Sequence, residues 1–217
     1  MEVKDLTIKV GKEELLKNVS FTLIPGQLNL IIGKNGVGKT LLLDELSCLD
    51  KRSSALQGFP ARSDIIYQTQ GVPFISEATV EQTLTLIGDL THSSDRLLKN
   101  IPPMIANHLP RKFGKLSSGE RRFLIIWAIL NVDKELYLLD EPFANLDLST
   151  IKKVMTLFYE KVSEGKTIVA TTHQFDFLDR DKTHIIVLKE GQVIFENSLA
   201  AFYAYYSDFQ ALFDEYL

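Results

Sequence analysis

Residues 33–40, GKNGVGKT, have the composition and spacing of a loop that binds phosphate groups. Glycines at these positions allow backbone N–H groups to fold around phosphate oxygens, and the N-terminus of a following helix adds to the attraction. In such a loop the amine of Lys39 reaches the β- and γ-phosphates of a nucleotide, and the hydroxyl of Thr40 binds Mg²⁺. The predicted nucleotide contacts are Gly33, Lys34, Asn35, Gly36, Val37, Gly38, Lys39, Thr40 and Leu41.

Two adjacent carboxylates, Asp140 and Glu141, follow the apolar segment 135–139 and could complete such a site. At the C-terminal end of a strand, Asp140 can face the Mg²⁺ shell of a bound nucleotide. Glu141 can orient or deprotonate the attacking water, and a general base of this kind contributes about 10²–10⁴ in rate. Taken alone, Asp-Glu-Pro after a strand is more often the start of a loop. Together with the phosphate loop, it predicts a hydrolytic centre.

Short apolar segments must position these groups. The segment 28–32, LNLII, precedes the glycines and is typical of a strand buried on both faces of a parallel sheet. Residues 40–49 have leucines at helical spacings, so a strand and a helix flank the loop. A glycine-rich turn that only caps a helix is therefore the weaker interpretation. Further strands are predicted at 64–70, 135–140, 167–172 and 184–191. A helix predicted at 151–165 ends on Gly165, so strand–helix alternation implies a mainly parallel α/β sheet.

Two other regions depart from this alternation of strands and helices. Residues 3–10 and 18–25 are predicted as strands, with a Gly-Lys turn at 11–12 between them. Between about 72 and 130 the chain changes to helical segments, at 80–90 and 93–101, which prolines interrupt before the apolar run FLIIWAIL.

Composition excludes several classes of protein. The chain has 217 residues, and 24 basic against 28 acidic residues give a formal net charge of −4. Without a basic excess to neutralise phosphates, no nucleic-acid partner is expected. The single cysteine, Cys48, excludes an intramolecular disulfide and suits a reducing compartment. The first ten residues lack the apolar region of a secretory signal, and FLIIWAIL is too short to span a bilayer.

The segment LSSGE, at 116–120, resembles the signature sequence of the ATP-binding cassette (ABC) family, whose usual form is LSGGQ. It also fits a capping box, in which Ser117 is the N-cap and Glu120 lies three residues later. Other family landmarks appear in order. Gln70 matches the Q-loop glutamine, and the distance to the next helix favours it over Gln68. His173, after the strand 167–172, matches the switch histidine, although a histidine at a strand end is usually structural.

The resemblance, which runs from about residue 2 to 197, implies a fold and a set of roles. The implied fold is an α/β P-loop NTPase (RecA-like) with a mainly parallel sheet, an N-terminal antiparallel β subdomain and an inserted α-helical subdomain. Residues 1–71 and 131–217 would form the ATP-binding core, and 72–130 the helical signature subdomain, within a single domain 1–217. The implied catalytic residues are Glu141, His173 and Gln70, the Mg²⁺ ligands are Thr40, Gln70 and Asp140, and the cofactors are ATP and Mg²⁺.

The family also implies a shared active centre. Two cassettes pack head to tail, so that the signature of one, here Ser117, Ser118, Gly119 and Glu120, closes over the ATP of the other. Residues 145–147 resemble the D-loop. Asp147 could lie at the dimer interface, cap the following helix, or do both.

The function that this resemblance implies is the ATPase subunit of an ABC transporter. Its partners would be a second ATPase subunit, identical or paralogous, and a separate transmembrane permease. We expect a cytoplasmic protein held at the membrane through that permease, and the compact chain resembles the ATPases of small exporters. The alternative is a soluble ABC-type ATPase acting on ribosomes or DNA. Only 45 residues separate Gln70 from Leu116, too few for the long coiled coil of the DNA-repair members. A kinase-like P-loop enzyme outside the family leaves LSSGE unexplained.

Three positions depart from the family pattern. Val10 stands where an aromatic residue usually stacks on adenine, so we expect weaker adenine recognition. Ser118 replaces a glycine, which costs on the order of 1 kcal/mol if that residue needs a positive φ and nothing if it is helical. Glu120 stands where glutamine is usual. All catalytic-type residues are present, so hydrolytic competence is expected.

The C-terminal segment 198–217 is rich in aromatic residues at three- and four-residue steps, which predicts an amphipathic helix. Packing of this helix on the domain's own core is favoured over docking to a partner. The predicted apolar face consists of Phe202, Tyr205, Phe209, Leu212, Phe213 and Tyr216.

Overall fold

The computed structural model describes residues 1–47, 53–71, 74–99, 101–209 and 211–212. Its strands are β1 (Glu2–Val10), β2 (Glu13–Thr22), β3 (Leu28–Ile32), β4 (Leu56–Gln57), β5 (Ile65–Gln68), β6 (Leu136–Leu139), β7 (Thr167–Thr171), β8 (Thr183–Lys189) and β9 (Gln192–Ser198). Its helices are α1 (Lys39–Leu46), α2 (Val80–Thr91), α3 (Ser94–Lys99), α4 (Pro103–Ala106), α5 (Ser118–Leu130), α6 (Leu148–Ser163) and α7 (Leu199–Tyr205). Cys48 lies outside the described residues.

The larger of two sheets has the strand order β5-β6-β7-β3-β8-β9. Its pairings are parallel from β5 to β8, and β9 adds an antiparallel edge. The mainly parallel sheet that the sequence predicts is therefore confirmed, although the edge strand β9 was not among the predicted strands. In this order the ends of β6 and β7 lie close to the loop that follows β3, because the carboxyl ends of parallel strands share one edge.

The smaller sheet, of order β2-β1-β4, is antiparallel and confirms the predicted N-terminal β subdomain. Leucines of α1 share an apolar cluster with β1 and β2, on one face of the larger sheet. The side chains of Leu28, Leu30 and Ile32 belong to a second cluster on the opposite face, with α5 and α6, whereas Ile31 belongs to the first. Alternate residues of β3 thus enter different cores, as expected for a strand buried on both faces.

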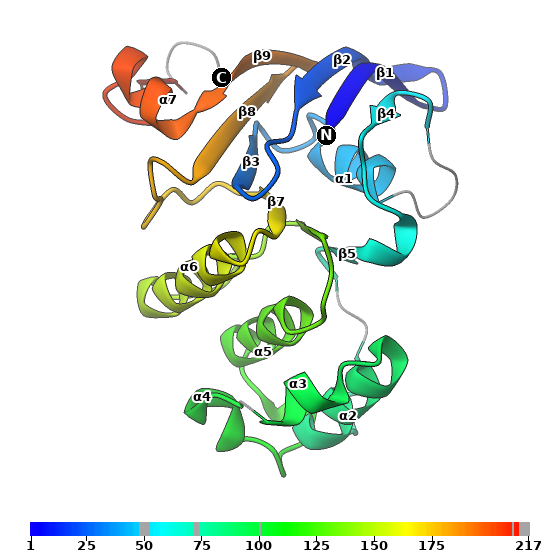
Figure 1. The fold of residues 1–217 in the computed structure, drawn as a ribbon, viewed down its shortest axis with the longest axis vertical. Helices are drawn as coiled ribbons and strands as arrows, with labels where there is room; N and C mark the ends of the chain where they lie inside the picture. The colour runs from blue at the N-terminus through cyan, green and yellow to red at the C-terminus, as the bar shows by residue number, and fades with distance from the viewer. Residues whose placement is uncertain (48–52, 72–73, 100, 210, 213–217) are drawn as a thin grey trace.

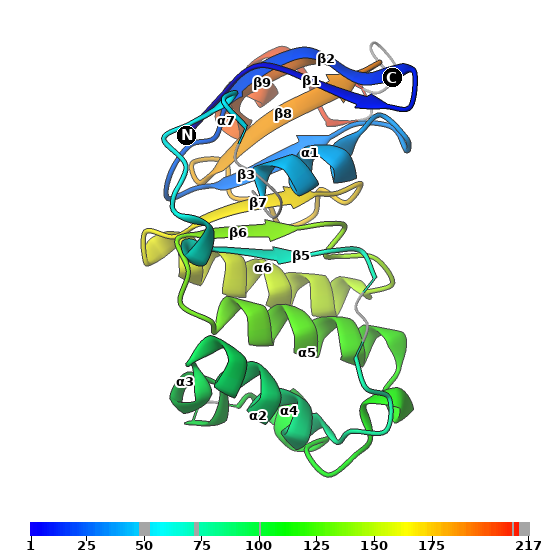
Figure 2. The same ribbon diagram turned by 90° about the vertical axis from the view of Figure 1, so that its right-hand side faces the viewer.

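Helices α5 and α6 lie beneath the parallel sheet, and α2, α3 and α4 lie beyond α5 at the far end of the molecule (Figures 1 and 2). The helical character of 72–130 is confirmed. Helix α5, however, places its apolar residues in the same core as the sheet and α6. The division at residue 130 between a core and a helical subdomain therefore stays a prediction. Along the described ranges, no helix is both long and apolar enough to cross a membrane.

The helix ends follow local signals in the sequence. Ser117 is the N-cap of α5, with its hydroxyl accepting from the Glu120 N–H at 3.2 Å and the Glu120 carboxylate accepting from the Ser117 N–H at 2.7 Å. This confirms the capping box. Ser118 is the first residue of the helix, so its serine side chain carries no backbone cost. Helix α6 ends before Gly165, whose φ of +80° confirms the C′ glycine.

The C-terminal prediction is partly wrong. Helix α7 ends at Tyr205, and Tyr206 is extended, so one continuous helical face does not form. Tyr205 is 75% exposed, whereas Phe202, Phe209 and Leu212 are buried in the main core. Packing on the domain itself is thus confirmed for these three residues. Phe213 and Tyr216 lie outside the described residues.

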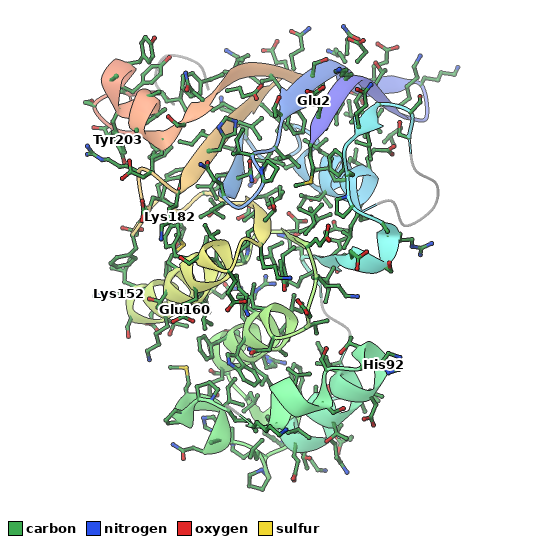
Figure 3. All side chains as sticks on the ribbon, viewed as in Figure 1. Glu2, His92, Lys152, Glu160, Lys182 and Tyr203 are labelled. Carbon is green, nitrogen blue, oxygen red and sulfur yellow. The ribbon has the colours of Figure 1, made fainter. Side chains whose placement is uncertain are left out.

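Contacts from the loop between β7 and β8 also hold α7 and the segment after it. The Arg180 guanidinium lies over the ring of Tyr203, 4.5 Å from its centroid. Tyr203 is labelled on α7 in Figure 3. The ring of Phe175 stacks on that of Phe209, with centroids 3.9 Å apart. Aromatic contacts of this kind add to the area that the rings bury.

The turn between β8 and β9 packs directly on β2, which suggests a test of stability. Gly191 has a φ of +79°, and a Cβ there would lie 2.2 Å from the Leu15 carbonyl oxygen. We expect Gly191→Ala to lower the free energy of unfolding by about 2–4 kcal/mol, because backbone strain and overpacking add. The matched control is Gly165→Ala, with the same φ region but open space. It should cost about 1 kcal/mol in the same urea unfolding experiment. Equal losses for the two variants would contradict the clash.

Candidate nucleotide site

A cavity of about 580 Å³ opens at the carboxyl edge of the parallel sheet, beside the loop after β3. It combines residues from distant parts of the chain, and seven of the twelve have polar side chains. Its lining residues are Leu15, Asn35, Gly36, Gly38, Lys39, Thr40, Leu41, Gln70, Asp140, Glu141, Ala144 and His173. The topology brings four strands, β3, β5, β6 and β7, to this edge, and each leads into at least one of these residues.

The phosphate loop is shaped by the strand β3, the helix α1 and the neighbouring strand β2. Gly38 has a φ of +104°, which favours glycine, and a Cβ there would lie 2.8 Å from the Leu16 side chain. Helix α1 begins at Lys39, directly after this turn. Its first N–H groups therefore face the loop, in the arrangement that binds anions.

The amine of Lys39 lies inside the loop. It donates to the carbonyl oxygens of Gly33 at 2.7 Å and Lys34 at 3.2 Å. Burial lowers the pKa of Lys39, whereas the nearby carboxylates Glu141 and Asp140 oppose that shift. A buried cation between an anion-binding loop and two carboxylates is well placed to stabilise the charge of a phosphate group.

Asp140 connects the phosphate loop to the strand β7. Its two carboxylate oxygens accept from the Thr40 hydroxyl at 2.8 Å and the Thr171 hydroxyl at 2.6 Å. The side chain is buried, with 1% of its surface exposed. Thr171, which sequence reasoning did not single out, thus orients the carboxylate. Its position on β7, directly beside β6, is decided by strand order alone.

A hydroxyl and a carboxylate in contact offer the hard oxygen ligands that Mg²⁺ prefers. In the described part of the chain no cluster of three or more His, Cys, Asp or Glu side chains could hold a metal. This donor set fits Mg²⁺ bound together with a nucleotide, since that ion usually takes one or two carboxylates, water and substrate phosphates.

Glu141 and His173 meet beside the phosphate loop and the start of α1. The Glu141 carboxylate lies 3.3 Å from His173 Nε2. Glu141 has a φ of +47°, and its N–H donates to the Thr171 hydroxyl at 2.8 Å. His173 Nε2 also lies 3.0 Å from Asn35 Oδ1 and 3.3 Å from Lys39 Nζ. The strained backbone at Glu141 turns its carboxylate into the cavity beside the phosphate loop, as a base acting on water there requires.

Gln70 and Gln68 differ in where they lie. Gln70 lines the cavity. Gln68 is buried in β5, with its amide donating to the Thr69 carbonyl at 2.7 Å. The geometry therefore supports the sequence preference for Gln70 as the residue that faces a nucleotide.

Leu15, rather than the predicted Val10, lines the cavity. Val10 is 52% exposed near the end of β1 and is not among the residues that line the cavity. Leu15, on β2, does line it. Sequence reasoning missed Leu15 because the pairing of β1 with β2, rather than any local pattern, decides which side chain reaches the cavity. Adenine contact by Val10 stays a prediction.

The signature residues do not line this cavity. Ser118 instead lines a neighbouring cleft of about 210 Å³, together with Gln70, Arg122 and Asn145. Gly119 lies against the D-loop segment, where a Cβ would be 3.5 Å from the Asn145 carbonyl oxygen. Asp147 caps α6, with its carboxylate accepting from the Thr150 N–H at 2.9 Å. This hydrogen bond lowers the pKa of Asp147, and the capping alternative is confirmed.

Arg122 is a further charged residue at the site that sequence reasoning did not assign. Burial lowers the pKa of its guanidinium, and the charges of Asp140 and Glu141 partly oppose this shift. The side chain lines the neighbouring cleft, near enough to both carboxylates for their charges to act on it. The only sequence signal was its position two residues after LSSGE.

Comparison with known proteins agrees with this geometry. The family model described as ABC transporter matches residues 16–144, more than half of the chain. An ABC transporter ATP-binding protein of Methanocaldococcus jannaschii is 26% identical over 202 residues, which cover 89% of this chain and 76% of that relative. The chain spans 42% and 32% of two longer curated relatives.

Solved structures show the same fold. An ATP-binding subunit of an ABC transporter superposes with a TM-score of 0.80 at 22% identity, over 99% of this chain and 98% of the other. A dimeric ATP-binding cassette in a post-hydrolysis state, bound to ADP and Pi, has a TM-score of 0.71 and 25% identity. That alignment covers 91% of this chain and 98% of the other.

Proposed function

Because the chain belongs to the ABC transporter family of ATP-binding proteins, we propose that ATP hydrolysis at its cavity powers a separate membrane permease. The chain is an ATPase cassette that binds ATP. The observation that carries the proposal is the meeting of Lys39, Asp140, Glu141 and His173 at one cavity beside the phosphate loop. Those groups follow three separate strands, and their joint arrangement suits chemistry on a nucleotide's phosphates.

The proposed chemistry follows from the contacts. Loop N–H groups and Lys39 bind the phosphates, and Lys39 exchanges its bonds to Gly33 and Lys34 for phosphate oxygens. Glu141 accepts a proton from the attacking water while the water oxygen bonds to the γ-phosphorus. The bond from that phosphorus to the β–γ bridging oxygen breaks, and ADP leaves. His173, beside Glu141, holds the γ-phosphate in place. When bound at Thr40 and Asp140, Mg²⁺ would neutralise charge on the β- and γ-oxygens.

Each active centre in this proposal is completed by a second cassette. Residues 116–120 are not among those that line the cavity, so a signature turn that covers the γ-phosphate has to come from another copy or a paralogue. The dimeric ATP-binding cassette with ADP and Pi supports such an assembly for a protein of the same fold. The N–H groups at the start of α5 would then point at the partner's nucleotide.

One experiment tests both the permease partner and the location of the chain at the membrane. We expect a tagged chain to co-purify from detergent-solubilised membranes with a polytopic membrane protein, which would hold it at the cytoplasmic face. Co-sedimentation with ribosomes or DNA, without such a protein, would instead support the soluble alternative. The matched relatives are described as ABC transporter ATP-binding proteins, which favours the first outcome. The direction of transport, which we predict to be export, is tested by substrate movement in vesicles of known orientation.

The proposed Mg²⁺ ligand Asp140 offers a direct test of the metal. We expect Asp140→Asn to raise the Mg²⁺ concentration for half-maximal ATP turnover about tenfold or more, because an amide oxygen replaces a charged ligand. Binding of ATP without Mg²⁺ should change little. Asp89→Asn, an exposed site on α2, is the matched control and should leave the Mg²⁺ dependence unchanged. The same Mg²⁺ dependence in Asp140→Asn and wild type would contradict this role.

A further inference from the structure

Glu120 of the signature turn takes part in a group of charged contacts that reaches back to the segment after α4. One of its carboxylate oxygens accepts from the Ser117 N–H at 2.7 Å. The other lies 3.1 Å from His108 Nε2 and 3.9 Å from an Arg111 nitrogen. His108 and Glu120 are both partly buried, with 22% and 31% of their side chains exposed. The carboxylate is therefore held from two sides.

The contacts of His108 define a directed chain of hydrogen bonds. The Arg111 guanidinium lies 2.9 Å from His108 Nδ1, and Arg111 can only donate. Nδ1 is then the acceptor, so the ring proton is on Nε2 and points at Glu120. We assign this neutral tautomer from the hydrogen-bond geometry. Arg111 is itself anchored by its bond to the Lys115 carbonyl at 3.0 Å. The chain Arg111–His108–Glu120–Ser117 thus connects a cation to the first turn of α5.

This chain of hydrogen bonds can compensate the negative charge that a carboxylate at residue 120 brings to the signature turn. In the proposed assembly, the N-terminus of α5 faces the negatively charged phosphates of the partner's ATP. An uncompensated carboxylate three residues into the helix would repel those phosphates, since like charges across an interface oppose association. The capping box occupies the N–H groups of Ser117 and Glu120, and those of Ser118 and Gly119 lie outside it.

We propose that His108 and Arg111 are positioning residues that neutralise Glu120 and aim it away from the partner's phosphates. This inference rests on the composite site of the proposed function. The cation and the imidazole draw the carboxylate toward α4, and the signature turn then presents Ser117, Ser118 and Gly119 without an opposing charge. The hydrogen bonds with Ser117 and His108 keep the carboxylate in place. The Ser117 N–H, with a smaller effect from Arg111, lowers the pKa of Glu120 against the opposing effect of burial, so the carboxylate stays ionised.

A double-mutant cycle separates this role from a structural one. We expect His108→Ala to raise the protomer concentration for half-maximal ATP turnover about three- to tenfold, the range for losing a partly exposed charge-assisted hydrogen bond. In a Glu120→Gln background, where no negative charge needs compensation, the same substitution should change that concentration less than about twofold. Arg111→Ala should follow the same pattern. Equal effects in both backgrounds would overturn the inference.

Two further variants complete the test. His108→Gln keeps a donor toward Glu120 and an acceptor toward Arg111, so it should restore near-wild-type turnover. His92→Ala, at the exposed end of α2, is the matched control and should have no effect. A His108→Ala protein that unfolds at a lower temperature, with Glu120→Gln giving no relief, would show a purely structural role. Ser117→Arg separates failure of the positioning role from failure of the composite site. If Ser117→Arg abolishes turnover while His108→Ala behaves as wild type, only the positioning role fails.

Discussion

Replacement of Glu141 with glutamine should reduce ATP turnover by about 10²–10⁴, the range for a lost general base. The amide keeps the size of the side chain and can still bond to His173, which lies 3.3 Å from the carboxylate. It cannot take a proton from water. Because Lys39 and the phosphate loop are untouched, ATP binding should persist. With hydrolysis blocked, the ATP-bound dimer should accumulate.

The measurement pairs steady-state phosphate release with the apparent mass of the chain in ATP. Glu135→Gln is the matched control, because Glu135 immediately precedes β6, at the end of the strand away from the cavity. It should turn over ATP as the wild type does and form no stable dimer. Wild-type turnover in Glu141→Gln would place the base elsewhere, and His173 would then be the next residue to test.

Ser117→Arg should abolish hydrolysis while the protomer still binds ATP. Ser117 is the N-cap of α5 and lies outside the residues that line its own chain's cavity, so a bulky cation there leaves the phosphate loop intact. In the proposed dimer the same arginine would block closure over the partner's γ-phosphate and remove the hydroxyl that caps the helix. Equilibrium binding of a fluorescent ATP analogue, measured beside turnover, separates the two steps.

Mixing two inactive variants tests whether the site is shared between chains. Lys39→Ala removes the phosphate-binding amine of one protomer, and Ser117→Arg the signature of the other. A mixed dimer then contains one complete centre, so an equimolar mixture should recover up to about a quarter of wild-type turnover, given random two-fold pairing. Full activity of Ser117→Arg alone, or of highly diluted wild-type protomers, would contradict a composite site. No recovery on mixing, despite dimer formation, would contradict it as well.

The local parts of this protein could be predicted from its sequence. The strand 28–32, the loop 33–40 and the start of α1 are adjacent in the chain, and the glycine spacing and the Lys-Thr pair that mark the loop lie within eight residues. The same holds for the capping box at Ser117 and Glu120 and for the C′ glycine at 165. Such features depend on neighbours along the chain, which a single sequence displays directly.

Other features required the packed fold. Thr171 bonds to Asp140 because β7 lies beside β6, Leu15 rather than Val10 lines the cavity because of the register of β2, and His108 meets Glu120 because the segment after α4 packs against α5. The C-terminal aromatic pattern predicted one helix, yet the chain bends after Tyr205 so that Phe209 can reach the main core.

One physical reason separates the features that the sequence determined from those that only the packed fold decided. Backbone conformation, caps and glycine turns are governed by interactions over a few residues, so the sequence determined the motifs, the elements and the chemistry they make available. Which side chains meet depends on strand order and register, where burial of apolar area against distant segments outweighs local preference. Only the tertiary structure could therefore decide the partners of Asp140, the wall of the cavity and the charges around Glu120.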